Sequence, residues 1–130
     1  MARFKWFIPL LFTLFVVGCA RVEPVRNIEN TPVIYDLQSY QVKLAITQAA
    51  SHRGWQIEEV SPGVLLAKIN VRDHYAEVKI PYSDKYYSIL YVNSFNLDAA
   101  GGNIHRNYNG WVRNLNMDTQ RLLAMMAGQP

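Results

Sequence analysis

The chain has 130 residues, of which 13 are basic, 10 are acidic and only one is a cysteine. This length accommodates one domain of about 100 residues with its own hydrophobic core, and a single cysteine excludes an internal disulfide. Arg3 and Lys5 contribute two of the three excess positive charges, so the rest of the chain carries +1, from 11 basic and 10 acidic residues. It has no basic stripe of the kind that binds nucleic acid, and we expect no nucleic-acid partner.

Residues 1–18 have the pattern of a secretory signal peptide. A basic start is followed by an apolar run over residues 7–17 and by a small residue, Gly18, before the cysteine. A helix that spans a bilayer needs about 20 apolar residues, which makes this run too short for a transmembrane anchor. We therefore predict that residues 1–18 are removed and that the mature chain begins at Cys19.

Cys19 closes the run Val16-Val17-Gly18-Cys19, which resembles a bacterial lipobox. The resemblance implies a diacylglyceryl thioether and an N-acyl group on Cys19, and two or more acyl chains hold a protein stably on a membrane. Aspartate after the cysteine retains enterobacterial lipoproteins in the inner membrane, so Ala20 favours the outer membrane, with the domain in the periplasm. The alternative is a secreted protein that is cut elsewhere and keeps a free thiol at this position.

Residues 19–32 are predicted to form the lipidated N-terminus and a flexible tether. The segment over residues 20–31 contains Pro24 and is followed by Pro32, and it shows neither a helical nor a strand period. A single periplasmic domain is expected over residues 33–127.

This domain is predicted to contain two helices and four strands. Apolar stripes of helical period indicate a helix over residues 40–53 and a last helix over residues 108–126. Alternating residues and turn signals indicate strands over residues 55–60, 64–72, 74–82 and 86–95. Short connections favour an antiparallel meander, so the expected fold class is α+β: a two-layer domain with a four-stranded antiparallel meander and two helices on one face.

The predicted sheet has apolar residues on both of its faces. Strand 86–95 contains tyrosine and isoleucine in one phase but also Leu90 and Val92 in the other, and the outer phase of strand 64–72 begins with two apolar residues. Because two helices cover only one face, we expect an exposed apolar patch, which marks an interaction site. The candidate interaction face comprises Val64, Leu66, Tyr87, Ile89 and Tyr91. The alternative is that the tyrosines favour strands and fill the core.

The sequence contains no catalytic or metal-binding constellation. His52, His74 and His105 are far apart, no His-x-x-x-His motif joins them, and no cysteine remains as a ligand for a structural zinc site. A nucleophile elbow such as Gly-x-Ser-x-Gly is also absent. We therefore predict that the protein is not an enzyme and has no catalytic residue, no metal and no cofactor.

The stretch from Gly54 onward is similar to a family of small, uncharacterised proteobacterial lipoproteins. The motifs that carry the similarity are Arg53-Gly54-Trp55, Pro62-Gly63, Arg72-Asp73-His74, Tyr87-Ser88-Ile89, Asn96-Leu97, Ile104-His105 and Asn107-Tyr108-Asn109-Gly110-Trp111. The similarity covers most of the domain and assigns no catalytic residue or ligand.

These features predict a membrane-anchored envelope lipoprotein that acts as a structural or protein-interaction module, with a protein partner or a second copy of itself. The alternative is a small carrier that holds a lipid or glycan fragment between helices and sheet. A carrier would have a cavity between the two layers, whereas an interaction module would expose an apolar surface.

Overall fold

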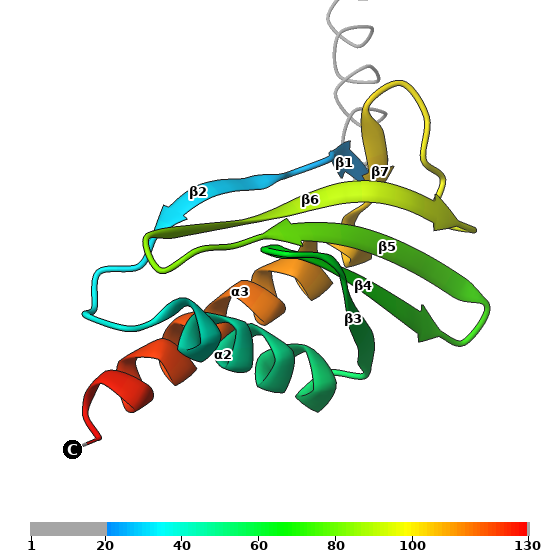
Figure 1. Ribbon diagram of the computed structural model, residues 1–130. Coiled ribbons are helices and arrows are strands. Elements are labelled where there is room, and N and C mark those ends of the chain that lie inside the picture. The colour runs from blue at the N-terminus through cyan, green and yellow to red at the C-terminus, as the bar shows by residue number, and fades with distance from the viewer. Residues whose placement is uncertain (1–20, 130) are drawn as a thin grey trace, which may run out of the picture.

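The computed structural model describes residues 21–129, which form two helices and two β-sheets (Figure 1). The elements in chain order are β1 Val22–Pro24, β2 Ile28–Pro32, α2 Ser39–His52, β3 Trp55–Ser61, β4 Val64–Val71, β5 His74–Pro81, β6 Tyr86–Phe95, β7 Asn103–His105 and α3 Arg106–Ala127. The predicted signal peptide and Cys19 lie outside the described residues.

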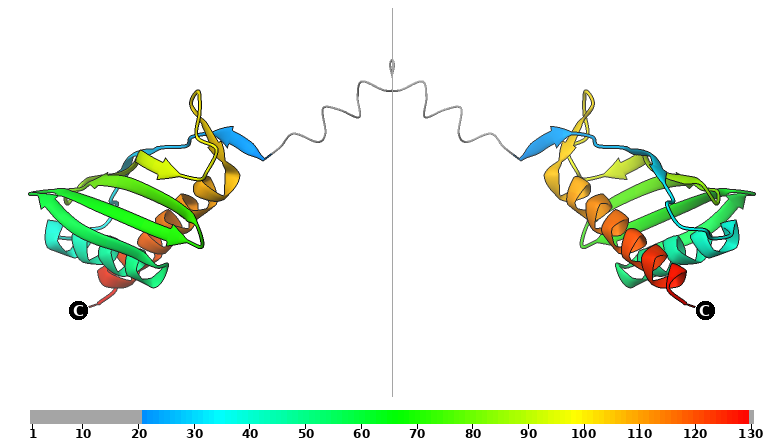
Figure 2. Two further views of the ribbon diagram at one scale, coloured as in Figure 1. Left: turned by 90° about the vertical axis from the view of Figure 1, so that its right-hand side faces the viewer. Right: turned by 90° about the vertical axis from the view of Figure 1, so that its left-hand side faces the viewer.

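The main sheet has five antiparallel strands in the order β2-β6-β5-β4-β3. Strands β3 to β6 follow one another as the predicted meander, and both helices lie on the same face of it (Figures 1 and 2). The α+β class is therefore confirmed. The number of strands differs from the predicted four, because β2 joins the sheet beside β6.

This fifth strand comes from the segment for which the sequence predicts a flexible tether. Ile28 lies opposite Ile89 on β6, and the side-chain oxygen of Asn27 accepts a hydrogen bond from the backbone N–H of Tyr91 at 2.9 Å. The tether prediction is therefore wrong for residues 21–32, which belong to the folded domain. β2 is short, irregular in register and ends in proline. Its strand conformation therefore depends on pairing with β6, because its sequence has no alternation of apolar and polar residues.

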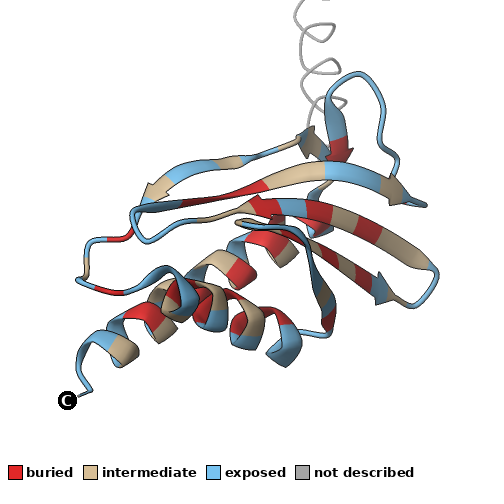
Figure 3. Ribbon diagram, viewed as in Figure 1, coloured by how far each residue is buried: buried red, intermediate tan, exposed pale blue. Residues whose placement is uncertain are grey.

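Both helices place an apolar stripe against the sheet, and buried positions recur along them at helical spacing (Figure 3). The predicted stripe of the first helix is confirmed by its buried residues, Val42, Ala45, Ile46, Ala49 and Ala50. This helix ends before Gly54, whose φ of +88° is a left-handed conformation that glycine adopts without steric strain. Burial of each large apolar side chain in this core contributes about 1.5–3 kcal/mol.

Two tyrosines lie in the core with different polar surroundings. Tyr87 on β6 and Tyr108 on α3 are 1% and 0% exposed. The Tyr87 hydroxyl donates to Oδ1 of Asn116 and accepts from Nε2 of Gln120 at 2.6 Å, both on α3. The Tyr108 hydroxyl has no hydrogen-bond partner among the described residues, and its ring meets that of Tyr91 edge-on, with ring centroids 5.5 Å apart. Burial raises the pKa of both buried phenols, so both stay neutral.

Replacing each buried tyrosine by phenylalanine removes the same atom but should give different results. Tyr87→Phe leaves two amide side chains of α3 without their partner and should lower the free energy of unfolding by about 1–2 kcal/mol. Tyr108→Phe removes a buried hydroxyl without a partner, so the free energy should stay the same or rise by about 1 kcal/mol. Urea denaturation of both variants measures the difference. A larger loss in Tyr108→Phe than in Tyr87→Phe contradicts this account of the core.

Candidate functional site

The residues of the predicted interaction face are divided between the two faces of the sheet. Tyr87 and Ile89 point toward the helices and are buried, and Tyr91 packs its ring against Tyr108 on α3. These three residues therefore belong to the core side of β6, which corrects their assignment to an interaction face. The period of a strand identifies residues that share a face, but it does not say which face the helices cover.

β6 contains two apolar residues in its outer phase: Leu90 lies opposite Lys79 of β5, and a register shift lies at Val92. Val78 of β5 pairs with Tyr91. Its neighbour Glu77 pairs with Asn93, so Val92 is an extra residue on β6 between the two pairs. Such a bulge changes the phase of the strand at that point. Val92 therefore occupies the bulge and does not extend an apolar stripe across the sheet.

The uncovered face of the sheet mixes charged and apolar residues. Val64 and Leu66 lie on this face, as predicted, and both are half-buried. In the register of the sheet, Leu66 lies between Glu58 on β3 and Lys79 on β5, and the neighbouring row pairs a lysine with a glutamate. Charged side chains thus separate the apolar residues, as is usual for the solvated face of an antiparallel sheet.

An exposed apolar groove lies between α2 and the last turns of α3, and we call it the helix groove. Its volume is about 280 Å³, and its apolar lining residues are Tyr40, Leu44, Leu122, Met125 and Met126. Tyr40, Leu44 and Met125 are 68%, 45% and 56% exposed, whereas most large apolar side chains of a folded domain are buried. Sequence reasoning missed this groove. The signal was present, because Tyr40 and Leu44 are four residues apart on α2 and lie outside its buried stripe.

A second, polar groove lies between the N-terminal segment and the first half of α3, and we call it the entry groove. Its volume is about 490 Å³. Its lining includes Arg26, Arg106, Arg113, Glu23, Asn109 and Trp111. The two sides of this groove come from opposite ends of the chain, since β1 lies beside the first turns of α3 at the end of the domain where the chain enters (Figure 2).

The buried Asn109 side chain holds the two sides of the entry groove together. Its Nδ2 donates to Oε1 of Glu23 and to the carbonyl oxygen of Pro24, both at 2.9 Å. Its Oδ1 accepts from the backbone N–H of Arg26 at 3.1 Å. One residue of α3 therefore forms hydrogen bonds to three residues of the N-terminal segment. The sequence contained this residue in a cluster of asparagines, but nothing in its spacing identified the partner segment.

Glu59 on β3 joins α2 to two turns of the sheet. Its carboxylate accepts hydrogen bonds from Nζ of Lys43 at 2.8 Å, the hydroxyl of Tyr82 at 2.7 Å and the backbone N–H of Gly63 at 3.3 Å. The bond from Lys43, with the others, lowers the pKa of Glu59 to about 2. Burial and the bond to Glu59 raise the pKa of Tyr82 to about 12. Neither group exchanges a proton near neutral pH, so the cluster links elements and is not suited to acid–base catalysis.

A second ionic cluster joins the end of α2 to α3. The carboxylate of Asp118, which is buried, lies 2.7 Å from Nε of Arg53 and 3.0 Å from Nη1 of Arg121. The hydrogen bond from Arg53 is the main cause of the lowered pKa of Asp118. The cluster therefore stabilises the helix pair when the carboxylate is charged.

The three histidines do not form a common site. His52 ends α2 and is exposed. Nδ1 of His74 lies 2.6 Å from the carbonyl oxygen of Asn96, and Nδ1 of His105 accepts from the backbone N–H of Asn107 at 3.1 Å. Across residues 21–129, no group of three or more histidine, cysteine or acidic side chains is arranged to hold a metal ion.

Comparison of the chain with protein-family models, with curated proteins and with solved structures finds no match. The similarity to small proteobacterial lipoproteins therefore stays a prediction from sequence motifs. Within the part of the chain that the structure describes, no helix combines the length and the hydropathy needed to cross a bilayer.

Loss of the Asn109 side chain should detach the N-terminal segment. Asn109→Ala removes three hydrogen bonds at a buried position, so we expect the free energy of unfolding to fall by about 2–3 kcal/mol. Cleavage within residues 21–32 by a protease should also become faster, because this segment frays before the core unfolds. Mass spectrometry of the fragments locates the cuts. Asn107→Ala is the matched control, because Asn107 is exposed and should give little change. If residues 21–32 are equally resistant to the protease in the two variants, Asn109 does not hold the N-terminal segment in place.

Proposed function

We propose that this protein is a membrane-anchored envelope lipoprotein, acylated at Cys19, whose domain is a protein-interaction module. The lipobox-like run that ends at Cys19 supports the anchor. Cys19 is the only cysteine of the chain, and it stands where a signal peptide should end. The described residues begin at Arg21, two positions after Cys19 in the sequence.

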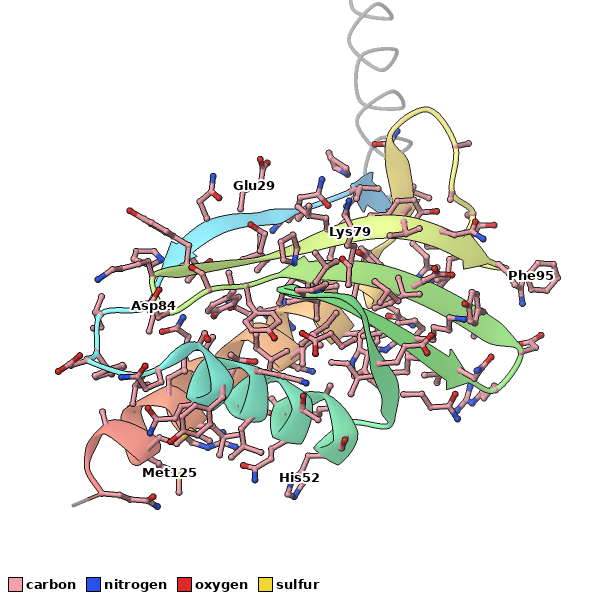
Figure 4. All side chains as sticks on the ribbon, in the orientation of Figure 1. Glu29, His52, Lys79, Asp84, Phe95 and Met125 are labelled. Carbon is pink, nitrogen blue, oxygen red and sulfur yellow. The ribbon has the colours of Figure 1, made fainter. Side chains whose placement is uncertain are left out.

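The observation that carries the interaction proposal is the position of the helix groove. The chain enters the domain beside the first turn of α3, where the backbone N–H of Arg106 donates to the carbonyl oxygen of Arg21 at 2.9 Å. Met125 lies near the other end of this helix (Figure 4). At 1.5 Å per residue the two ends are about 30 Å apart. A domain anchored at its entry end would therefore hold the helix groove away from the membrane.

The helix groove also has the composition of an interaction surface. Aromatic residues and methionine are enriched at protein interfaces, usually with a polar rim around an apolar centre. Here Tyr40, Leu44 and Met125 are exposed, and Gln41, Gln48 and Gln129 line the same groove. The uncovered face of the sheet has charged residues between its apolar ones. The helix groove therefore replaces the sheet face as the surface that we propose for a partner.

The space between the layers weighs against the alternative of a ligand carrier. Large side chains from both layers fill it and are almost completely inaccessible, among them Tyr87, Tyr108, Ile46, Leu65, Ile80, Ile89, Leu115 and Leu123. A carrier would need a cavity of several hundred Å³ lined by such residues. The helix groove and the entry groove both lie at the surface instead.

Acylation at Cys19 can be tested directly. Cys19→Ala removes the thiol that would form the thioether, so labelling of the protein with a fatty-acid probe should be abolished. Gly18→Ala keeps a small residue before the cysteine and should keep the label. Detection of the probe on the gel band of each variant, with equal loading, provides the measurement. Label that persists in Cys19→Ala would overturn the anchor proposal.

The helix groove can be tested by photo-crosslinking in living cells. A photoreactive residue at position 44 should give a discrete adduct of higher mass, and one at position 79, on the uncovered face of the sheet, should give none. Met125→Ser should reduce the adduct from position 44 several-fold. Its effect on unfolding should stay below about 1 kcal/mol, because Met125 is 56% exposed. Adducts at position 79 alone, or at neither position, would refute the interaction surface.

A further inference from the structure

We infer that the entry groove docks on the anionic phospholipid headgroups of the membrane that holds Cys19. The inference rests on the proposed acylation, and it adds a second, electrostatic contact between the domain and the same membrane. The residues that would make this contact are Arg26, Arg106, Arg113 and the neighbouring Trp111, which all line the groove.

The entry groove is more basic than the rest of the domain. Residues 19–130 contain 11 basic and 10 acidic residues, so this part of the chain is almost neutral. The entry groove contains three of these arginines but only one acidic residue, Glu23. The oxygen Oε1 of Glu23 accepts the hydrogen bond from Asn109. The rest of this part of the chain therefore has one more acidic than basic residue, and positive charge is concentrated at the entry groove.

The arginines of the described residues differ in their ion pairs. Arg53 and Arg121 share the carboxylate of Asp118, whereas Arg26 and Arg113 form no ion pair with another described residue. The guanidinium of Arg113 lies beside Gly110, one turn back along α3, and both Arg26 and Arg113 are exposed. These two cations can therefore face an external anion.

Covalent geometry keeps Cys19 close to Arg21. Arg21 is fixed to α3 by the hydrogen bond from Arg106. Two residues of extended chain span at most about 7 Å, so the α-carbon of Cys19 lies within that distance of Arg21. An acylated Cys19 would bring the membrane surface to this end of the domain. Electrostatic attraction acts over about 8 Å at physiological ionic strength, so basic residues add to the anchor only when they lie at this end of the domain, as those of the entry groove do.

The chemistry of the groove suits a phospholipid surface. Arginine binds phosphate through two parallel N–H donors, and tryptophan is enriched where protein meets the headgroup layer of a bilayer. Each basic residue near an anionic membrane surface strengthens binding about five-fold. Trp111 lines the groove and is only partly buried, so it also reports on the contact by its fluorescence.

The test uses the full chain, purified in uncharged detergent and reconstituted into vesicles that contain a phospholipid with a quencher on its headgroup. Phosphatidylcholine vesicles are compared with vesicles that also contain phosphatidylglycerol. All proteins in the test carry Trp55→Phe, so that Trp111 is the one tryptophan of residues 19–130. Phosphatidylglycerol should increase quenching of its fluorescence, and high salt should reverse the increase. The double variant Arg26→Gln/Arg113→Gln should lose the increase. The matched variant Lys68→Gln/Lys79→Gln, on the uncovered face of the sheet, should keep it, and unchanged melting temperatures exclude unfolding as the cause.

The outcomes separate this inference from the proposed function. Quenching that is the same in both kinds of vesicle, or that the two arginine changes leave unaltered, overturns the docking of the entry groove even when Cys19 is acylated. Mass spectrometry of the same sample reports acylation independently. If the chain carries no acyl group, the proposed anchor fails. The groove is tested even then. If the two arginine changes reduce quenching in phosphatidylglycerol vesicles, the groove is supported as a lipid-binding surface, and if they do not, it is refuted.

Discussion

The three hydrogen bonds of the Asn109 side chain hold the N-terminal segment against α3, and the arrangement of both ends of the domain depends on them. The amide is buried, so its donors and its acceptor need partners inside the protein. Those partners are two backbone groups and one carboxylate of residues 23–26. The segment that they fix continues into β2, which covers the edge of β6. Asn109 thus acts together with the pairing of β1 with β7 and of β2 with β6, which closes one edge of the sheet.

The fixed point of entry gives the domain two ends with different chemistry. The entry groove, with its arginines, lies beside Arg21, whereas the helix groove, with Tyr40 and Met125, lies toward the far end of α3. The two helices that form the helix groove are held together by the ion pair between Arg53 and Asp118 and by their apolar stripes. In the proposed function, one end of the domain would contact a membrane while the other end meets a partner.

The uncovered face of the sheet shows how register changes the meaning of an apolar residue. Leu66 is apolar and faces solvent, but pairing places Glu58 and Lys79 beside it. On β6, Leu90 lies opposite Lys79 on the uncovered face, whereas Val92 occupies a bulge. Neither fact is local to one strand. Exposure of a large apolar patch arises instead on the helices, where Tyr40 and Leu44 lie outside the buried stripe of α2.

The sequence by itself determined the α+β class, the meander from β3 to β6 and the buried stripe of α2, because these features depend on the local period of hydrophobic residues. It also contains the lipobox-like run before Ala20, and this run is recognised without any knowledge of tertiary contacts. Only the tertiary structure decided that residues 21–32 are part of the domain, which face of β6 is buried, and that Asn109 and the three arginines meet in one groove. These features depend on contacts between residues of different elements, such as Asn109 with Glu23 and Tyr87 with Asn116, and no local period encodes such a pairing.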